Sequence, residues 1–106
     1  MMQYQHISVP SNGAQITIDS KGQWYIPDHP VIAYIEGDGV GQDISPVMRD
    51  IVDAAVNHAY QGDKQIHWME VFNGEKAAAL YDGDWFPQET LHAVRHYKIA
   101  IKGPPT

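Results

Sequence analysis

The feature that most constrains the fold is a near-continuous apolar run, VIAYI at residues 31–35, followed by a glycine-rich turn and a long helical pattern. An apolar run of this length without alternation is typical of a strand covered on both faces in a parallel sheet. In residues 43–60, apolar side chains recur at spacings of three and four, which predicts an amphipathic helix. They are Ile44, Val47, Met48, Ile51, Val52, Ala55 and Ala59. A strand followed by such a helix indicates the first half of a β-α-β crossover.

Two residues mark the ends of this helix. Pro46 is tolerated only near the start, so we expect it within the first turn. Gly62 follows the last periodic residues and fits the position just past a helix end.

Further elements complete the pattern. Residues 66–72 and 98–101 read as strands. Between them, Asn73 is placed to cap a short helix, and Pro87 to occupy the first position of a helix that ends near Tyr97. Strands thus alternate with helices, which predicts an α/β fold with a mainly parallel sheet and crossover helices.

The first thirty residues differ from the rest. They are polar, and they predict a small hairpin in which residues 16–18 pair with residues 24–26 across a turn at residues 19–22. The length of 106 residues alone predicts one domain. We therefore divide the chain into an extension with a hairpin, residues 1–30, and an α/β part, residues 31–106.

The composition excludes several classes of function. Thirteen acidic against seven basic residues give a net charge of −6, which argues against nucleic acid or an anionic membrane as a partner. The absence of cysteine removes disulfides, thiolate metal sites and cysteine nucleophiles, and fits a reducing cytosol. No export signal or run of eighteen apolar residues is present, so we expect no leader or anchor.

The glycine-rich turn resembles a phosphate-binding loop only superficially. Gly37, Gly39 and Gly41 give the spacing G-x-G-x-G, whereas a dinucleotide fingerprint needs G-x-G-x-x-G. Glu36 and Asp38 would also place negative charge beside a bound pyrophosphate. A structural turn that needs positive φ or close backbone approach is favoured, and Asp38 is expected to bind backbone amides within it.

Other side chains allow alternative interpretations. Glu89, His92 and His96 share one face of a predicted helix and are suitable metal ligands, but a solvated helix face is the favoured interpretation. The three tryptophans lack interleaved basic residues, which favours packing over base stacking. Lys102 follows an apolar strand, and its ammonium group either points into a cleft or marks a solvated strand end.

Several motifs occur together in a fixed order. The chain contains VIAYIEGDGVGQDISPVMRDIVDAAVNHAY, then IHWMEVFNGEKA, and finally WFPQETLHAVRHYKIAIKGPPT. From about Ile26 to Thr106 this closely resembles the amino-terminal part of bacterial NADP-dependent isocitrate dehydrogenases, in the isocitrate/isopropylmalate dehydrogenase family. The combination of IEGDGVG, NGEKA and AIKGPPT in this order is far more specific than any single glycine pattern.

The resemblance implies a fold and a reaction. In this family the α/β sheet is distinct from the Rossmann type, and residues 31–106 would form the amino-terminal part of the large domain. The complete enzyme is expected to be a cytoplasmic homodimer of the tricarboxylic acid cycle. It would oxidise isocitrate to 2-oxoglutarate and CO₂ with NADP and Mg²⁺ or Mn²⁺.

The resemblance assigns few site residues to this chain. Thr106 matches the family's threonine near the nicotinamide end of NADP, and Lys102 matches the lysine that begins the same loop, so both are cofactor-side candidates. Pro105 departs from the usual leucine. No catalytic or metal residue is assigned, because those of the family lie beyond Thr106.

Two functional hypotheses follow. In the first, the chain is the amino-terminal segment of the dehydrogenase, is inactive alone, does not bind NADP or metal tightly, and self-associates through uncovered edges. In the alternative, it is a shortened non-catalytic homologue that binds a full-length dehydrogenase or a regulator.

Overall fold

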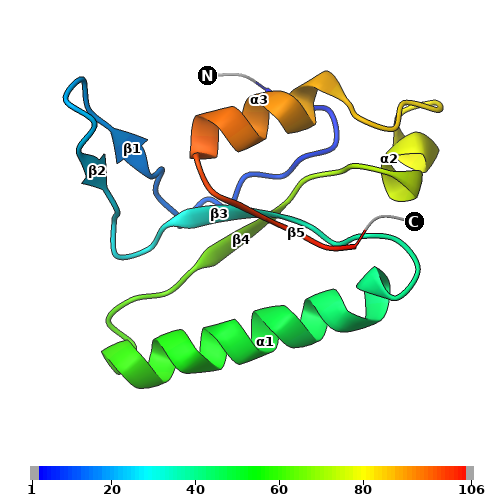
Figure 1. The fold of residues 1–106 in the computed structure, drawn as a ribbon. Helices are drawn as coiled ribbons and strands as arrows, with labels where there is room; N and C mark the ends of the chain where they lie inside the picture. Colours follow the sequence, from blue (N-terminus) through cyan, green and yellow to red (C-terminus); the bar gives the residue numbers. More distant parts are fainter. Residues whose placement is uncertain (1–2, 105–106) are drawn as a thin grey trace.

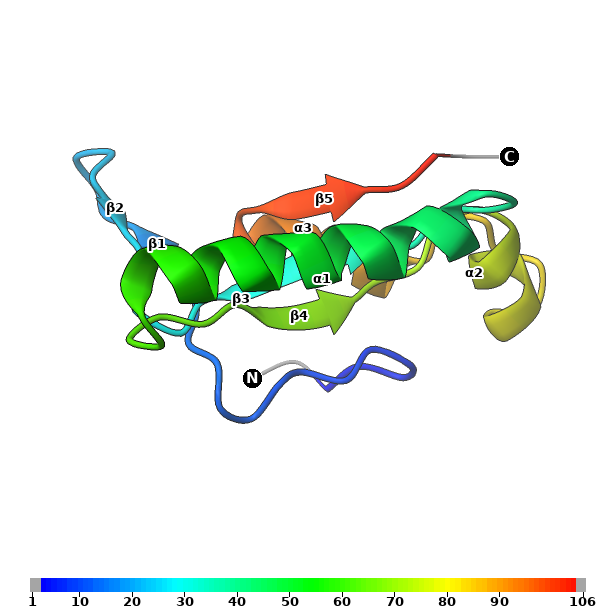
Figure 2. The same cartoon turned by 90° about the horizontal axis from the view of Figure 1, so that it is seen from below.

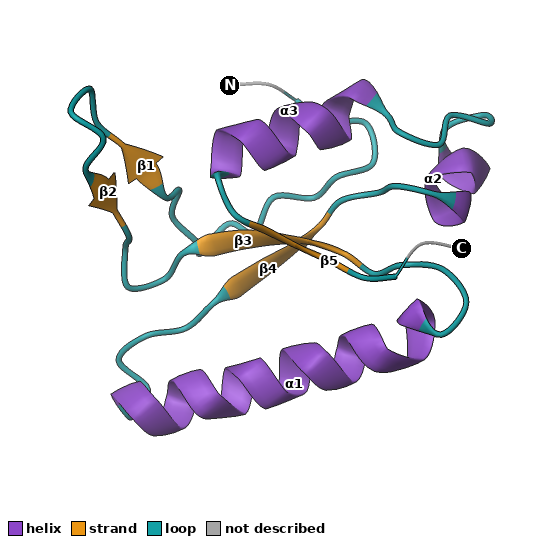
Figure 3. Ribbon diagram, in the orientation of Figure 1, coloured by secondary structure: helices purple, strands orange, loops and turns teal. Residues whose placement is uncertain are grey.

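The computed structural model describes residues 3–104. Figure 1 shows a small sheet with one long helix on one face and a shorter helix on the other, and Figure 3 shows the same elements coloured by type. In chain order they are β1 (Thr17–Ile18), β2 (Trp24–Tyr25), β3 (Val31–Ile35), α1 (Gly41–Tyr60), β4 (His67–Glu70), α2 (Glu75–Leu80), α3 (Gln88–Tyr97) and β5 (Ala100–Lys102). The predicted α/β class, with an amino-terminal hairpin, is confirmed.

The main sheet is parallel and has the strand order β4-β3-β5. The apolar run at residues 31–35 forms β3 and lies in the centre, where it pairs Val31 with His67 on one side and Ala33 with Ala100 on the other. Buried side chains from β3, from β4 and the two residues that follow it, and from α3 form the core. They include Val31, Ala33, Met69, Val71, Phe72 and Ala93.

α1 begins earlier than expected, and the expectation for Pro46 is wrong. The carbonyl oxygens of Asp38, Gly39 and Val40 accept the first helical amides, so the helix grows directly out of the glycine turn at Gly41. Pro46 therefore lies inside the helix, one turn beyond its start.

The carboxyl end of α1 agrees with the sequence pattern. Gln61 and Gly62 both have positive φ, 53° and 86°, and turn the chain away from the helix axis. β5 begins at Ala100 and not at residue 98, because Lys98 has φ +76° and closes α3 by donating its N–H to the carbonyl of Val94.

The short helices also start differently from the sequence prediction. Asn73 does not cap α2; its N-cap residue is Gly74, with φ +87°. Pro87 is the N-cap of α3 and not its first helical residue. At the start of α2, the Asp38 carboxylate from the glycine turn accepts the Glu75 N–H.

The hairpin of β1 and β2 is short, and it extends away from the main sheet (Figure 1). Its turn is closed by Asp19, whose carboxylate accepts the N–H groups of Lys21 and Gln23. Trp24 is 46 % exposed and Trp85 is 55 % exposed, so the prediction that the tryptophans pack inside the protein is wrong for these two. No helix among residues 3–104 is long and apolar enough to cross a membrane.

Candidate functional site at the carboxyl edge of the sheet

Three chain segments leave the parallel sheet at the same edge. β3 and β5 end side by side, with Ile35 paired to Lys102, and β4 ends nearby at Glu70. Ligands of open α/β sheets usually bind outside this carboxyl edge. The glycine turn after β3 and the loop after β5 therefore define the candidate site.

The backbone of the turn and the backbone of the loop meet at distances that only glycine allows. A Cβ atom on Gly103 would lie 2.2 Å from the carbonyl oxygen of Glu36, and one on Gly37 would lie 2.6 Å from that of Pro104. Gly37 and Gly39 have φ of +89° and +58°. The structural interpretation of the turn is confirmed, since the loop after β5 packs directly against it.

Asp38 connects this turn to two other segments. Its backbone N–H donates to the carbonyl of Pro104 at 3.0 Å, and its carboxylate Oδ2 accepts the N–H of Glu75 at 3.0 Å. A Cβ on Gly74 would lie 2.5 Å from the same carboxylate oxygen. The Asp38 side chain thus binds the start of α2, for which Asn73 was the expected cap.

Lys76 links the ends of two strands. Its Nζ lies 2.6 Å from Glu70 at the end of β4 and 3.4 Å from Glu36 after β3. Burial lowers the pKa of Lys76, but the hydrogen bond and charge of Glu70, together with Glu36, outweigh burial and hold this pKa above its ordinary value.

The sequence reasoning missed this ion cluster. The signal was present in part, because Glu36 directly follows one predicted strand, Glu70 lies near the end of the next, and the lysine lies in the NGEKA motif. Beside the cluster is a pocket of about 320 Å³, lined by Glu36, Asp38, Gln42, Glu75, Lys76 and Ala79.

Lys102 is exposed at the end of β5. Its Nζ donates to the carbonyl of Gly103 at 3.2 Å, and it forms no ion pair with any residue in the range 3–104. The ammonium group is thus available to an anionic ligand. Pro105 and Thr106, the other candidate of this loop, lie outside the described residues.

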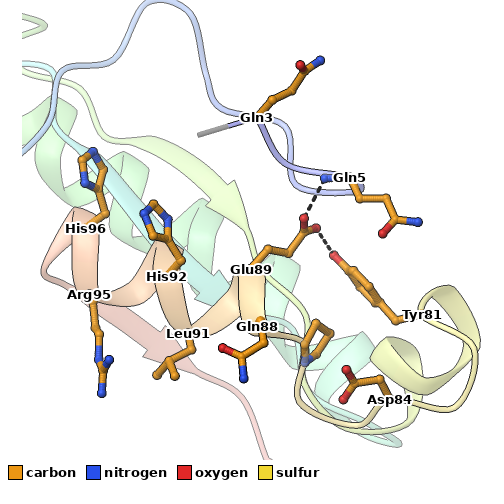
Figure 4. Close-up of a pocket in the computed structure, with 11 residues that line it drawn as sticks. Gln3, Gln5, Tyr81, Asp84, Gln88, Glu89, Leu91, His92, Arg95 and His96 are labelled. Atoms are coloured by element: carbon orange, nitrogen blue, oxygen red, sulfur yellow. Dashed lines mark hydrogen bonds between the residues drawn. The ribbon is translucent and has the colours of Figure 1, made fainter. Parts of the chain in front are cut away.

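The three side chains of α3 that were weighed as metal ligands make other contacts. Figure 4 shows Glu89 pointing toward Gln5. Its carboxylate accepts the N–H groups of Gln5 and His6 at 2.6 and 3.0 Å and the hydroxyl of Tyr81. Glu89 therefore binds the amino-terminal segment to α3.

The histidines of this face are also engaged. His92 Nδ1 lies 2.7 Å from the hydroxyl of Tyr4, and the His92 and His96 rings stack with centroids 5.5 Å apart. Across the described part of the chain, no three His, Cys, Asp or Glu side chains are grouped so that they could hold a metal ion. The favoured prediction of a solvated helix face does not hold for Glu89, because this side chain is half-buried.

The sequence model described as isocitrate/isopropylmalate dehydrogenase matches residues 31–106, most of the chain and all of the main sheet. The chain belongs to this family. The match includes the glycine turn, NGEKA and the loop after β5, which are the segments that converge at the candidate site.

The individual relatives are named isocitrate dehydrogenase (NADP). Isocitrate dehydrogenase (NADP) of Pseudomonas aeruginosa is 56 % identical over 106 residues and is matched by 99 % of this chain. Isocitrate dehydrogenase (NADP) 1 of Psychrobacter sp. is 54 % identical over 105 residues, and the enzyme of Archaeoglobus fulgidus is 39 % identical over 105 residues, each matched by 99 % of this chain. The chain spans only about a quarter of each relative, 25, 25 and 24 % respectively.

The resemblance implies NADP and a divalent metal ion, and the described residues suit these two groups differently. For NADP, the exposed Lys102 supplies a cation at the edge of the sheet, while the glycine turn supplies no phosphate cradle because backbone fills the space beside Gly37. For a divalent metal ion, residues 3–104 offer no ligand set.

Proposed function

We propose that this chain supplies the cofactor-side edge of an NADP-dependent isocitrate dehydrogenase, whose complete subunit oxidises isocitrate to 2-oxoglutarate. The observation that carries the proposal is the packing of the Lys102 loop on the glycine turn within a sequence 56 % identical to a relative of that name. NADP, when bound, accepts the hydride from the substrate. Lys102 and Thr106 would lie on its side of the site.

The remaining parts of the activity belong to the complete subunit. The Mg²⁺ or Mn²⁺ ion that would polarise the substrate oxygens needs several carboxylate ligands close together. Residues 3–104 offer no group of three or more His, Cys, Asp or Glu side chains that could hold such an ion. We infer that the chain alone neither binds NADP tightly nor turns over isocitrate. The complete enzyme would act in the cytoplasm as a homodimer, in the tricarboxylic acid cycle.

A chimera tests this proposal. Residues 1–106 would replace the matching quarter of the Pseudomonas aeruginosa relative, and NADPH formation would be followed with isocitrate and Mg²⁺. The chimera is expected to be active, whereas the isolated chain is expected to be inactive under the same conditions. A folded but inactive chimera would refute the proposal and favour the alternative of a non-catalytic binding homologue.

A further inference from the structure

The loop that follows β5 packs on the backbone of Glu36. The carbonyl of Ile35 accepts the Gly103 N–H at 2.7 Å, and a Cβ on Gly103 would lie 2.2 Å from the Glu36 carbonyl oxygen. Lys102 directly precedes Gly103, and its Nζ donates to the Gly103 carbonyl. Because packing this close transmits a displacement, a shift of the backbone at Glu36 must move Gly103 and the base of the Lys102 side chain.

The side chain of Glu36 pairs with a single cation among residues 3–104, Lys76 of α2. The Glu36 carboxylate is 18 % exposed and lies 3.4 Å from Lys76 Nζ. The same Nζ lies 2.6 Å from Glu70, whose side chain is 26 % exposed at the end of β4. Two partly buried carboxylates that lose a shared ammonium group repel each other, so Lys76 determines whether Glu36 can keep its place.

The helix that carries Lys76 lies at the same end of the sheet as the loop. In Figure 1 and Figure 2, α2, the turn after β3 and the end of β5 all lie at one end of the molecule. The Glu75 N–H donates to the Asp38 carboxylate at 3.0 Å, which fixes the start of α2 to the turn. Lys76 follows Glu75 directly, so its Nζ is held within reach of both Glu36 and Glu70.

The charges around Lys76 argue against a direct contact with the cofactor. Glu36 and Glu70 already surround its ammonium group, and Asp38 and Glu75 line the pocket beside it. An anionic ligand such as NADP would meet an excess of negative charge there. Lys102, by contrast, forms no ion pair with any residue in the range 3–104. An influence of Lys76 on NADP must therefore pass through the loop.

We propose that Lys76 is a positioning residue for the cofactor: it holds the Glu36 turn against the loop after β5 and so determines where the Lys102 ammonium group lies. This inference rests on the proposed function, because it takes the loop to be the NADP side of the site. Without Lys76, repulsion between Glu36 and Glu70 displaces the turn, and Gly103 loses its close contact. Lys102 then occupies a wider range of positions, which weakens its contact with the cofactor.

Steady-state kinetics of the chimera with the Pseudomonas aeruginosa relative test the proposal. Lys76→Met removes the charge at similar side-chain length and should raise the Michaelis constant for NADP about threefold or more. The turnover number at saturating NADP and the constant for isocitrate should change much less. Lys76→Arg restores the charge and should recover most of the NADP affinity. Lys64→Met removes a lysine paired with Asp28 at 3.6 Å, before the start of β4, and should leave both constants unchanged.

A second substitution shows whether Lys76 acts through Glu36. Glu36→Gln removes one of the two carboxylates whose repulsion Lys76 prevents. In the Glu36→Gln background, Lys76→Met should therefore change the Michaelis constant for NADP much less than it does alone. An equal change in both backgrounds would indicate a direct contact of Lys76 with NADP and would overturn the proposal.

Amide hydrogen exchange of the chimera without NADP tests the same link independently of activity. The Gly103 N–H and the Asp38 N–H, which donates to the Pro104 carbonyl at 3.0 Å, should exchange faster in Lys76→Met. The Gln65 N–H, which donates to the Asp28 carbonyl at 3.1 Å before β4, should not.

The outcomes separate this inference from the proposed function. Unchanged exchange at both Gly103 and Asp38 would overturn the inference, whatever the kinetics. An unchanged constant for NADP in Lys76→Met would overturn it too, provided that Lys102→Met raises this constant. If Lys102→Met itself leaves the constant unchanged, the proposed function fails, and exchange at Gly103 alone decides whether Lys76 holds the loop.

Discussion

The backbone N–H of Asp38 donates a hydrogen bond to the carbonyl oxygen of Pro104, with the two atoms 3.0 Å apart. Through this bond the turn that follows β3 holds the loop that follows β5. The carboxylate of the same residue holds the first amide of α2 through Glu75. The conspicuous glycines thus serve to bring three segments together at the edge of the sheet.

Replacement of Asp38 tests this connection. Asp38 is 5 % exposed, and Asp38→Ala removes the acceptor for the Glu75 N–H. We expect the free energy of unfolding to fall by about 1–3 kcal/mol, because a backbone donor loses its partner. Urea denaturation measures this change. Asp50→Ala removes an exposed charge from α1 and should change the stability by no more than about 0.5 kcal/mol.

Two glycine substitutions separate close packing from backbone conformation. Gly103→Ala drives a methyl group into the Glu36 carbonyl and should cost about 2–3 kcal/mol. Gly39→Ala meets no atom within 4 Å but places alanine at φ +58°, so it should cost only about 1 kcal/mol. Thermal unfolding followed by circular dichroism compares them. Equal costs would show that close packing at Gly103 contributes little.

Thr90→Val tests a buried polar contact behind the site. The Thr90 hydroxyl donates to the Phe72 carbonyl at 2.7 Å and accepts the Phe72 N–H at 3.2 Å, and Thr90 is fully buried. Valine fills the same space but leaves both backbone groups unpaired, at an expected cost of about 2–4 kcal/mol in chemical denaturation. Thr90→Ser keeps the hydroxyl and should retain more of the stability. A serine variant less stable than the valine variant would contradict this reasoning.

Glu89 should make the amino-terminal segment sensitive to acid. Burial raises the pKa of Glu89, but hydrogen bonds from Tyr81 and the amides of Gln5 and His6 outweigh it, so this pKa lies below its ordinary value. A lowered folded-state pKa gives stability that is present above the unfolded-state pKa of about 4.3 and is lost as the pH falls through the folded-state value.

The variant Glu89→Gln measures that contribution. The difference in unfolding free energy between wild type and variant should be greatest near neutral pH and shrink below about pH 4.3. Amide exchange at Gln5 and His6 should also accelerate in the variant. Glu75→Gln removes an exposed charge of the same kind and provides the control. A difference that grows as the pH falls would contradict the assignment.

The sequence predicts some features of this fold far better than others. β3 was predicted residue by residue, because its burial on both faces leaves a continuous apolar run. The position of Pro46 within α1 and the start of α2 were not predicted correctly. Hydrogen bonds from the glycine turn decide where α1 and α2 begin. The roles of Lys76 and Glu89 depend on partners distant in sequence, which a local pattern does not reveal.

The site itself divides in the same way. Lys102 was selected from the motif AIKGPPT. In the structure it is the last residue of β5, at the carboxyl edge of the sheet where the α/β order predicts a ligand site. The packing that holds the loop after Lys102 could not be predicted from the sequence, because the contact of Gly103 with Glu36 joins segments far apart in the chain. Thr106, selected by the same motif, stays a prediction.

The Michaelis constant for NADP in the chimera with the Pseudomonas aeruginosa relative tests the central claim most directly. If the loop after β5 is the cofactor side of the site, Lys102→Met should raise this constant about tenfold or more and change the constant for isocitrate much less, because a cation facing the cofactor is lost. An unchanged constant for NADP in a folded, active variant would contradict the account.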